Sequence, residues 1–130
     1  MKRPRHNVMV VEDDPALRKL VHGYLETLGM AVVSVSDGRA ALTHLKDSVP
    51  DLICLDLMLP EFSGYDVCDS IRNTPALKDV PILVMSARTL PADRAQALDL
   101  GATAYLTKPF NRAEFVKQVR ALLPASVPQT

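Results

Sequence analysis

Five residues with acidic, hydroxyl or ammonium side chains stand at or just after the ends of short apolar runs. They are Glu12, Asp13, Asp56, Ser86 and Lys108. Taken singly, each has an ordinary explanation, because an acidic run is usually a solvated loop and an aspartate after a strand is often a turn residue. Their recurrence after four different apolar runs indicates instead that they share one site.

Carboxylates gathered in one crevice repel one another, so Glu12, Asp13 and Asp56 together require a proton or a cation. Oxygen ligands in an incomplete cage, with room for water, suit a hard divalent ion such as Mg²⁺ or Mn²⁺. Lys108 supplies a positive point charge that can reach a phosphoryl oxygen, and the hydroxyl of Ser86 can contact another. The set therefore predicts an aspartate nucleophile that accepts a phosphoryl group.

The elements that must position these residues follow from the apolar pattern. Five runs are continuous rather than alternating, which is typical of parallel strands buried on both faces. They span residues 8–11, 31–35, 52–55, 82–85 and 104–106. Segments with helical spacing separate them, so a strand and a helix alternate five times, the pattern of an α/β fold with a parallel sheet.

The helix after the first run carries the clearest signals. Its apolar residues share one stripe and are Leu17, Leu20, Val21, Tyr24, Leu25 and Leu28. Asp14 is interpreted as its N-cap rather than as a ligand, Pro15 suits its first turn, and Gly29 can end it. The other helices are expected at about 37–46, from near 63, from after Pro91 to Gly101, and from Asn111.

Right-handed connections of this length permit few windings of the sheet. We expect the flavodoxin-like order 2-1-3-4-5, a three-layer (βα)5 arrangement with helices on both faces. In this order the carboxyl ends of the first and third strands lie side by side where the winding reverses. Glu12, Asp13 and Asp56 would meet at this edge.

Composition and charge exclude several classes of protein. The chain has 130 residues, the length of one domain, and its 48% hydrophobic content excludes disordered and collagen-like chains. No apolar run approaches the roughly 18 residues of a membrane span. Lysine plus arginine and aspartate plus glutamate both total 15, so no direct nucleic-acid binding is expected. Cys54 and Cys68 lie in apolar patterns and are expected to be buried thiols in a reducing cytoplasm.

Four short motifs carry a resemblance to a known family. They are Val-Val-Glu-Asp-Asp at 10–14, Leu-Asp-Leu-Met-Leu-Pro at 55–60, Met-Ser-Ala at 85–87 and Lys-Pro-Phe at 108–110. Each is weak alone, but together, in this order, they resemble the receiver domain of two-component response regulators. The resemblance covers about residues 7–123 and implies the same flavodoxin-like fold. It leaves residues 1–6 as a basic leader and 124–130 as a flexible tail or the start of a linker.

The resemblance implies a role for each residue of the acidic site. Asp56 is implied to be the residue that a histidine kinase phosphorylates. Asp13 is implied to bind Mg²⁺ directly and Glu12 often through water, while the backbone carbonyl of Met58 is a further ligand. Lys108 is implied to contact the phosphoryl group.

The resemblance also implies a conformational switch. Ser86 matches the hydroxyl that turns inward to contact the phosphoryl group, and Tyr105 matches the aromatic residue that moves inward with it. The alternative for Tyr105 is an ordinary strand residue with its hydroxyl at the surface. Ala87 is small where the donor must approach, and the bond between Lys108 and Pro109 is typically cis in the family.

The chain departs from the common family pattern at two places. Phe62 stands where methionine is common, but Pro60 and Gly64 keep the turn chemistry of that loop. Arg88 lies at a variable family position that tunes the lifetime of the phosphorylated state.

Three other interpretations share part of this evidence. A flavodoxin would need a phosphate cradle after the first strand, but Glu12, Asp13 and Asp14 repel phosphate unless a metal intervenes. A haloacid-dehalogenase-type hydrolase would carry its nucleophile after the first strand and usually a cap domain. A degenerate receiver would bind proteins without phosphorylation, and the complete set of site residues argues against it.

The expected partners are a sensor histidine kinase or phosphotransfer protein and a downstream protein effector. Phosphorylation is expected to change the surface formed by the fourth helix, the fifth strand and the fifth helix. The chain is expected to be a monomer, or a weak dimer that forms through this surface. The only chemistry expected is self-phosphorylation and autodephosphorylation at Asp56, so the protein is not expected to be a multiple-turnover enzyme. It is expected to lie in the cytoplasm, with no membrane partner. The chain could also be the N-terminal receiver fragment of a longer regulator with an output domain.

Overall fold

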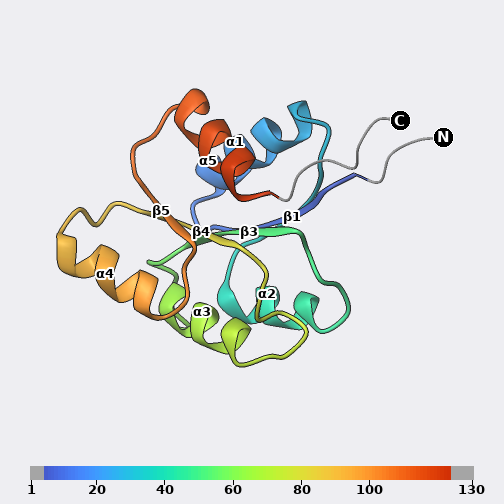
Figure 1. Cartoon of the computed structure of the whole chain (residues 1–130). Coiled ribbons are helices and arrows are strands. Elements are labelled where there is room, and N and C mark those ends of the chain that lie inside the picture. Colours follow the sequence, from blue (N-terminus) through green and yellow to red (C-terminus); the bar gives the residue numbers. More distant parts are fainter. Residues whose placement is uncertain (1–4, 124–130) are drawn as a thin grey trace.

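The computed structural model describes residues 5–123, and a parallel sheet forms the centre of this part of the protein (Figure 1). Its strands are β1 (Asn7–Val11), β2 (Ala31–Val35), β3 (Leu52–Asp56), β4 (Ile82–Ser86) and β5 (Ala104–Thr107). The order β2-β1-β3-β4-β5, with every neighbouring pair parallel, confirms the predicted topology. The predicted leader lies outside the described residues except for Arg5 and His6, and the predicted tail at 124–130 lies outside them entirely.

Helices alternate with the strands and cover both faces of the sheet. They are α1 (Pro15–Thr27), α2 (Gly38–Leu45), α3 (Gly64–Arg72), α4 (Pro91–Asp99) and α5 (Arg112–Leu122). α1 and α5 lie on one face, and α2, α3 and α4 lie on the other (Figure 1). This is the predicted three-layer α/β fold. None of the helices between residues 5 and 123 is long and apolar enough to cross a membrane.

A hydrophobic cluster lies on each face of the sheet, because successive residues of a strand point to opposite faces. In β1, Met9 and Val11 belong to the cluster under α2 to α4, whereas Val8 and Val10 belong to the cluster under α1 and α5. The central strands β1, β3 and β4 are buried along almost their whole length, which explains why their apolar runs are continuous. This packing fixes the carboxyl ends of the three strands relative to one another.

Side chains that bind the first backbone N–H groups define where α1, α2, α3 and α5 begin. Asp14 accepts a hydrogen bond of 3.1 Å from the backbone N–H of Ala16, with Pro15 in the first turn of α1, as predicted. Reciprocal capping boxes begin α3 at Ser63 and α5 at Asn111. The loops after β1, β3 and β5, which carry the predicted site residues, are therefore fixed at the ends that enter helices.

Two details of the predicted helices are wrong. Leu20, assigned to the apolar stripe of α1, is 48% exposed, because the buried side of this helix is centred on Val21 and Leu25. α4 ends at Asp99 rather than at Gly101, since Gly101 has a φ of 113°, a left-handed conformation that follows the end of a helix.

Gly64, the first residue of α3, lies where two backbone segments approach closely. A Cβ atom there would collide with the carbonyl oxygen of Asp56 and the Cα atom of Leu57. We expect Gly64→Ala to lower the free energy of unfolding by about 1–3 kcal/mol, the usual cost of overpacking. The control is Gly23→Ala in α1, where nothing lies within 4 Å of the added Cβ and stability should rise by about 0.5–1 kcal/mol. Urea denaturation measures both, and a Gly64→Ala variant as stable as Gly23→Ala would contradict this reasoning.

Candidate functional site

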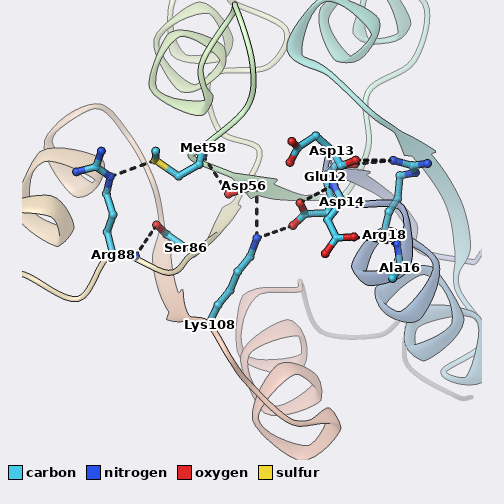
Figure 2. A network of polar contacts seen from close by, with 10 residues as sticks. All are labelled: Glu12, Asp13, Asp14, Ala16, Arg18, Asp56, Met58, Ser86, Arg88 and Lys108. Atoms are coloured by element: carbon cyan, nitrogen blue, oxygen red, sulfur yellow. Dashed lines mark hydrogen bonds and ion pairs between the residues drawn. The ribbon is translucent and has the colours of Figure 1, made fainter.

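Parallel pairing of β1 with β3 brings the predicted acidic residues together (Figure 2). Val11 is the register partner of Leu55. The residues that follow them, Glu12 and Asp56, therefore lie side by side at the carboxyl edge of the sheet. Together with Asp13 they offer carboxylate oxygens that all lie within 4.8 Å of one another. Glu12 and Asp56 are buried, whereas Asp13 is exposed, so the group opens to solvent on one side.

Lys108, just after β5, points into this group (Figure 2). Its Nζ atom lies 2.8 Å from Oε1 of Glu12 and 3.5 Å from Oδ2 of Asp56. The backbone N–H of Lys108 donates a hydrogen bond of 2.8 Å to the carbonyl of Ser86, and its bond to Pro109 is cis, as the resemblance implies. Residues from three strand ends thus meet at one point, as the order of the sheet predicts.

Burial and the ion pairs shift the protonation of two groups. Burial raises the pKa of Glu12 from 4.5 to about 7, although hydrogen bonds from Lys108 and from the backbone of Asp14 act in the opposite direction. Burial also disfavours the charged form of Lys108, but the hydrogen bond to Glu12 and the charge of Asp56 outweigh it, so the pKa of Lys108 is raised. Lys108 is therefore a fixed positive charge at neutral pH, and Glu12 is the group whose charge a bound cation would stabilise.

The donor set fits a hard divalent cation such as Mg²⁺. The three carboxylates supply oxygen ligands close together, and the exposed side of Asp13 leaves room for water. Lys108 compensates part of the negative charge of Glu12 and Asp56. A divalent ion would compensate the rest and oppose the effect of burial, which favours the protonated form of Glu12.

Arg18 in α1 holds the acidic loop, although it was not among the site residues predicted from the sequence. Its Nη1 atom donates hydrogen bonds to the backbone carbonyls of Glu12 (2.9 Å) and Asp13 (3.4 Å), as Figure 2 shows. The backbone N–H of Glu12 in turn donates to the carbonyl of Val35 in β2. The loop is thus tied to α1 and to β2, which fixes where its carboxylates begin. The only signal in the sequence is a cation in the first turns of the helix that follows the acidic run.

The loop after β3 contacts Asp56 directly. The backbone N–H of Met58 donates a hydrogen bond of 3.0 Å to Oδ1 of Asp56, so this oxygen is held while Oδ2 faces Lys108. The Sδ atom of Met58 lies 3.1 Å from Nε of Arg88, in the loop after β4 (Figure 2). This contact between two loops beside the acidic group could not be predicted from either residue type.

The loop after β4 connects the two residues of the predicted switch. Ser86 is buried, and its Oγ atom accepts a hydrogen bond of 3.1 Å from the backbone N–H of Arg88. The ring of Tyr105 is buried, and its hydroxyl donates a hydrogen bond of 2.9 Å to the carbonyl of Arg88 rather than standing free at the surface. The guanidinium of Arg88 also lies 3.3 Å from the carboxylate of Asp93 in α4. Arg88 is thus in contact with Ser86, Tyr105 and α4.

Similar structures share both the fold and the length of this chain. The chemotaxis protein CheY4 of Vibrio cholerae superimposes with a TM-score of 0.88 at 29% identity, covering 92% of this chain and all of CheY4. The receiver domain of a sensor histidine kinase from Pseudomonas aeruginosa has a TM-score of 0.84 at 32% identity, covering 92% of this chain and 98% of that one. That structure holds a magnesium ion coordinated in its active-site cleft.

The sequence relatives differ in how much of their length matches this chain. Protein PilG of Pseudomonas aeruginosa is 33% identical over 121 residues, which cover 93% of this chain and 90% of PilG. The probable transcriptional regulator ycf27 of Guillardia theta is 39% identical over 119 residues, which cover 92% of this chain but 46% of that protein. This chain spans about half the length of most of the curated relatives that it matches. Residues 8–120 match the response regulator receiver domain family, and the chain therefore belongs to this family of two-component signalling proteins.

Proposed function

We propose that this protein is a phosphorylation-dependent switch in which Asp56 accepts a phosphoryl group from a sensor histidine kinase or a phosphotransfer protein. The observation that carries the proposal is the meeting of the Glu12, Asp13 and Asp56 carboxylates within 4.8 Å, with the ammonium of Lys108 against two of them. Glu12 is the poorer nucleophile, because burial raises its pKa to about 7 and part of it is protonated at neutral pH. Asp56, with one oxygen held by the backbone and the other facing Lys108, is the better candidate.

In the proposed reaction an oxygen of Asp56 attacks the phosphorus atom of a phosphohistidine. A P–O bond forms as the P–N bond breaks, and the leaving imidazole takes a proton from solvent. Water later attacks the phosphorus atom of the acyl phosphate and releases inorganic phosphate, which returns Asp56 to its carboxylate. Alignment and charge neutralisation supply most of the assistance. The cycle resets a signal, so the protein is a switch rather than a multiple-turnover enzyme.

Glu12, Asp13, Asp56 and the backbone carbonyl of Met58 would hold Mg²⁺ or Mn²⁺. When bound, the divalent ion neutralises negative charge on the carboxylates and on the phosphoryl oxygens. Lys108 would hold a phosphoryl oxygen with its ammonium group, which is already directed at Asp56.

Ser86 and Tyr105 would convert phosphorylation into a change of shape. Ser86 would exchange its hydrogen bond with the backbone of Arg88 for one with a phosphoryl oxygen. Tyr105, bonded to the carbonyl of Arg88, would shift with the same loop. Because Arg88 also pairs with Asp93, the movement would reach α4 and the neighbouring face of β5 and α5. Phosphorylation would favour one conformer only as far as its contacts differ between the two.

The α4–β5–α5 face would bind a downstream protein effector in the cytoplasm. The chain would be a monomer, or a weak dimer that forms through the same face. The balanced charge supports a protein partner rather than direct nucleic-acid binding by this domain. We propose no membrane partner.

The lengths of the relatives favour a second version of this proposal. Transcriptional regulators whose matching part is about half of the protein suggest that the chain is the receiver part of a longer regulator with an output domain. PilG, matched over 90% of its length, supports a stand-alone regulator. In both cases the proposed chemistry at Asp56 is the same.

Phosphorylation by a small phosphodonor tests the proposal. We expect incubation with phosphoramidate and Mg²⁺ to add one phosphoryl group per chain, seen by mass spectrometry of the intact protein, and far less when a chelator removes the metal. Failure of both a small donor and a histidine kinase to label the folded protein in Mg²⁺ would overturn the proposal and favour the degenerate receiver.

The affinity for Mg²⁺ should depend on pH through Glu12. Its pKa is raised to about 7 by burial, so it carries a proton below that pH and must lose it to bind a cation. We expect the Mg²⁺ dissociation constant to rise about tenfold from pH 8 to pH 6. Isothermal calorimetry at several pH values measures this. Glu12→Gln should flatten the dependence, and an exposed control, Glu26→Gln, should leave it; a dependence that persists in Glu12→Gln would assign it elsewhere.

A further inference from the structure

Met58 differs from the other methionines of residues 5–123 in its accessibility. It is 49% exposed, whereas Met9, Met30 and Met85 are at most 8% exposed. Oxidation of a thioether to a sulfoxide requires access of the oxidant to sulfur and follows exposure. Within the described part of the chain, Met58 is therefore the methionine most accessible to a peroxide.

Met58 also contacts the site on two sides. Its backbone N–H holds Oδ1 of Asp56, and its Sδ atom lies 3.1 Å from Nε of Arg88 (Figure 2). Met58 belongs to the loop after β3 and Arg88 to the loop after β4. The thioether and the guanidinium thus join the two loops beside the phosphoryl acceptor.

We propose that Met58 is a redox-modification site, at which oxidation by hydrogen peroxide slows phosphoryl acceptance at Asp56. A sulfur lone pair attacks one peroxide oxygen, an S–O bond forms, the O–O bond breaks, and the other oxygen leaves as water after proton transfer. Sulfur loses two electrons and the peroxide gains them. The effect on acceptance rests on the function proposed for Asp56 above; the selectivity of the oxidation does not.

The sulfoxide changes the strength of the contact with Arg88. A thioether sulfur is a weak hydrogen-bond acceptor, whereas a sulfoxide oxygen is polar and would accept a charge-assisted hydrogen bond from the guanidinium. The stronger bond would hold the loop after β4 in its present position. In that position Ser86 is bonded to the backbone of Arg88, and it must leave this bond to contact a phosphoryl oxygen.

The two cysteines do not compete for the oxidant. Cys54 and Cys68 are buried, and burial raises the pKa of the first to about 12 and of the second to about 11. Both are protonated at neutral pH, and the protonated thiol is the unreactive form. A change of activity after mild peroxide treatment would therefore come from Met58 rather than from a thiol.

Peptide mapping tests the selectivity. Trypsin places the four methionines of residues 5–123 on separate peptides, 6–18, 20–39, 47–72 and 79–88. After brief peroxide treatment of the folded protein we expect one added oxygen on 47–72, located at Met58 by fragmentation, at least about tenfold faster than on the other three. Equal rates on all four peptides, or oxygen on Cys54 or Cys68 instead, would overturn the proposal.

Rates of phosphorylation before and after peroxide test the consequence, with each variant as its own reference. We expect oxidised wild-type protein to accept phosphate about tenfold more slowly, as for gain of a charge-assisted hydrogen bond, and methionine sulfoxide reductase to restore the rate. Met58→Leu and Arg88→Ala should each show no change with peroxide. A wild-type rate unaffected by complete oxidation of Met58, or a slowing that persists in Met58→Leu, would overturn the proposal. Absence of labelling in untreated protein would instead contradict the function of Asp56.

Discussion

Asp56→Asn should accept no detectable phosphoryl group from a small donor in Mg²⁺, a loss of more than about a thousandfold. The asparagine side chain has nearly the same shape as that of aspartate but lacks the negatively charged oxygen that attacks phosphorus. The fold should survive, because the amide oxygen can still accept the hydrogen bond from the backbone of Met58. Loss of the charge should also lower the pKa of Glu12, because the charge of Asp56 is one of the causes that raise it. Mass spectrometry of the phosphorylated chain and thermal unfolding separate chemistry from stability.

Asp79→Asn is the matched control, since Asp79 is exposed and precedes β4, at the edge of the parallel sheet opposite the site residues. It should be labelled like the wild type. Labelling of Asp56→Asn at more than a tenth of the wild-type rate would assign the acceptor to another residue.

Lys108→Met should slow phosphoryl acceptance by about a hundredfold, the usual cost of losing one charged donor to transition-state oxygens. The substitution keeps the length of the side chain but removes the ammonium that lies 2.8 Å from Glu12 and 3.5 Å from Asp56. Initial rates with a small phosphodonor at saturating Mg²⁺ measure the effect. Lys117→Met, an exposed change in α5, should leave the rate unaltered; a rate for Lys108→Met within threefold of wild type would contradict the role of this ammonium.

The same substitution should alter stability with a definite dependence on pH. The hydrogen bond from Lys108 lowers the pKa of Glu12, so its loss lets burial raise that pKa further above 7. A carboxyl group whose pKa is higher in the folded state stabilises the fold only while protonated, and this contribution is lost as pH rises. The destabilisation of Lys108→Met relative to wild type should therefore grow between pH 7 and pH 9. A constant difference across this range would contradict the coupling.

Most of the fold could be predicted from the sequence, because burial of a parallel sheet on both faces leaves continuous apolar runs. The order of the strands followed from the handedness and length of the connections. The exposure of Leu20 could not be predicted in this way. Periodicity defines a face of α1, but only the packing against β1 and β2 decides that Val21 is buried and Leu20 lies at the margin.

The candidate site divides in the same way. Once β1 and β3 are neighbours, Glu12 and Asp56 must lie side by side, so their meeting was predictable from topology. The contacts of the arginines were not. Arg18 donates to backbone carbonyls and Arg88 donates to a thioether sulfur. Neither kind of acceptor can be recognised from residue types or from their spacing in the sequence. The partners of long side chains depend on which groups the folded chain brings near them, and sequence patterns do not give this information.

Chemical trapping of the phosphorylated residue is the most direct test that Asp56 is the acceptor. Borohydride reduces an acyl phosphate to an alcohol, so an aspartyl phosphate becomes homoserine at the modified position. Wild-type protein phosphorylated in Mg²⁺, reduced and digested with trypsin should carry homoserine at position 56 of peptide 47–72 and at no other aspartate. Homoserine at Asp13, Asp51 or Asp66, or a stable phosphoryl group on a serine, would contradict the assignment.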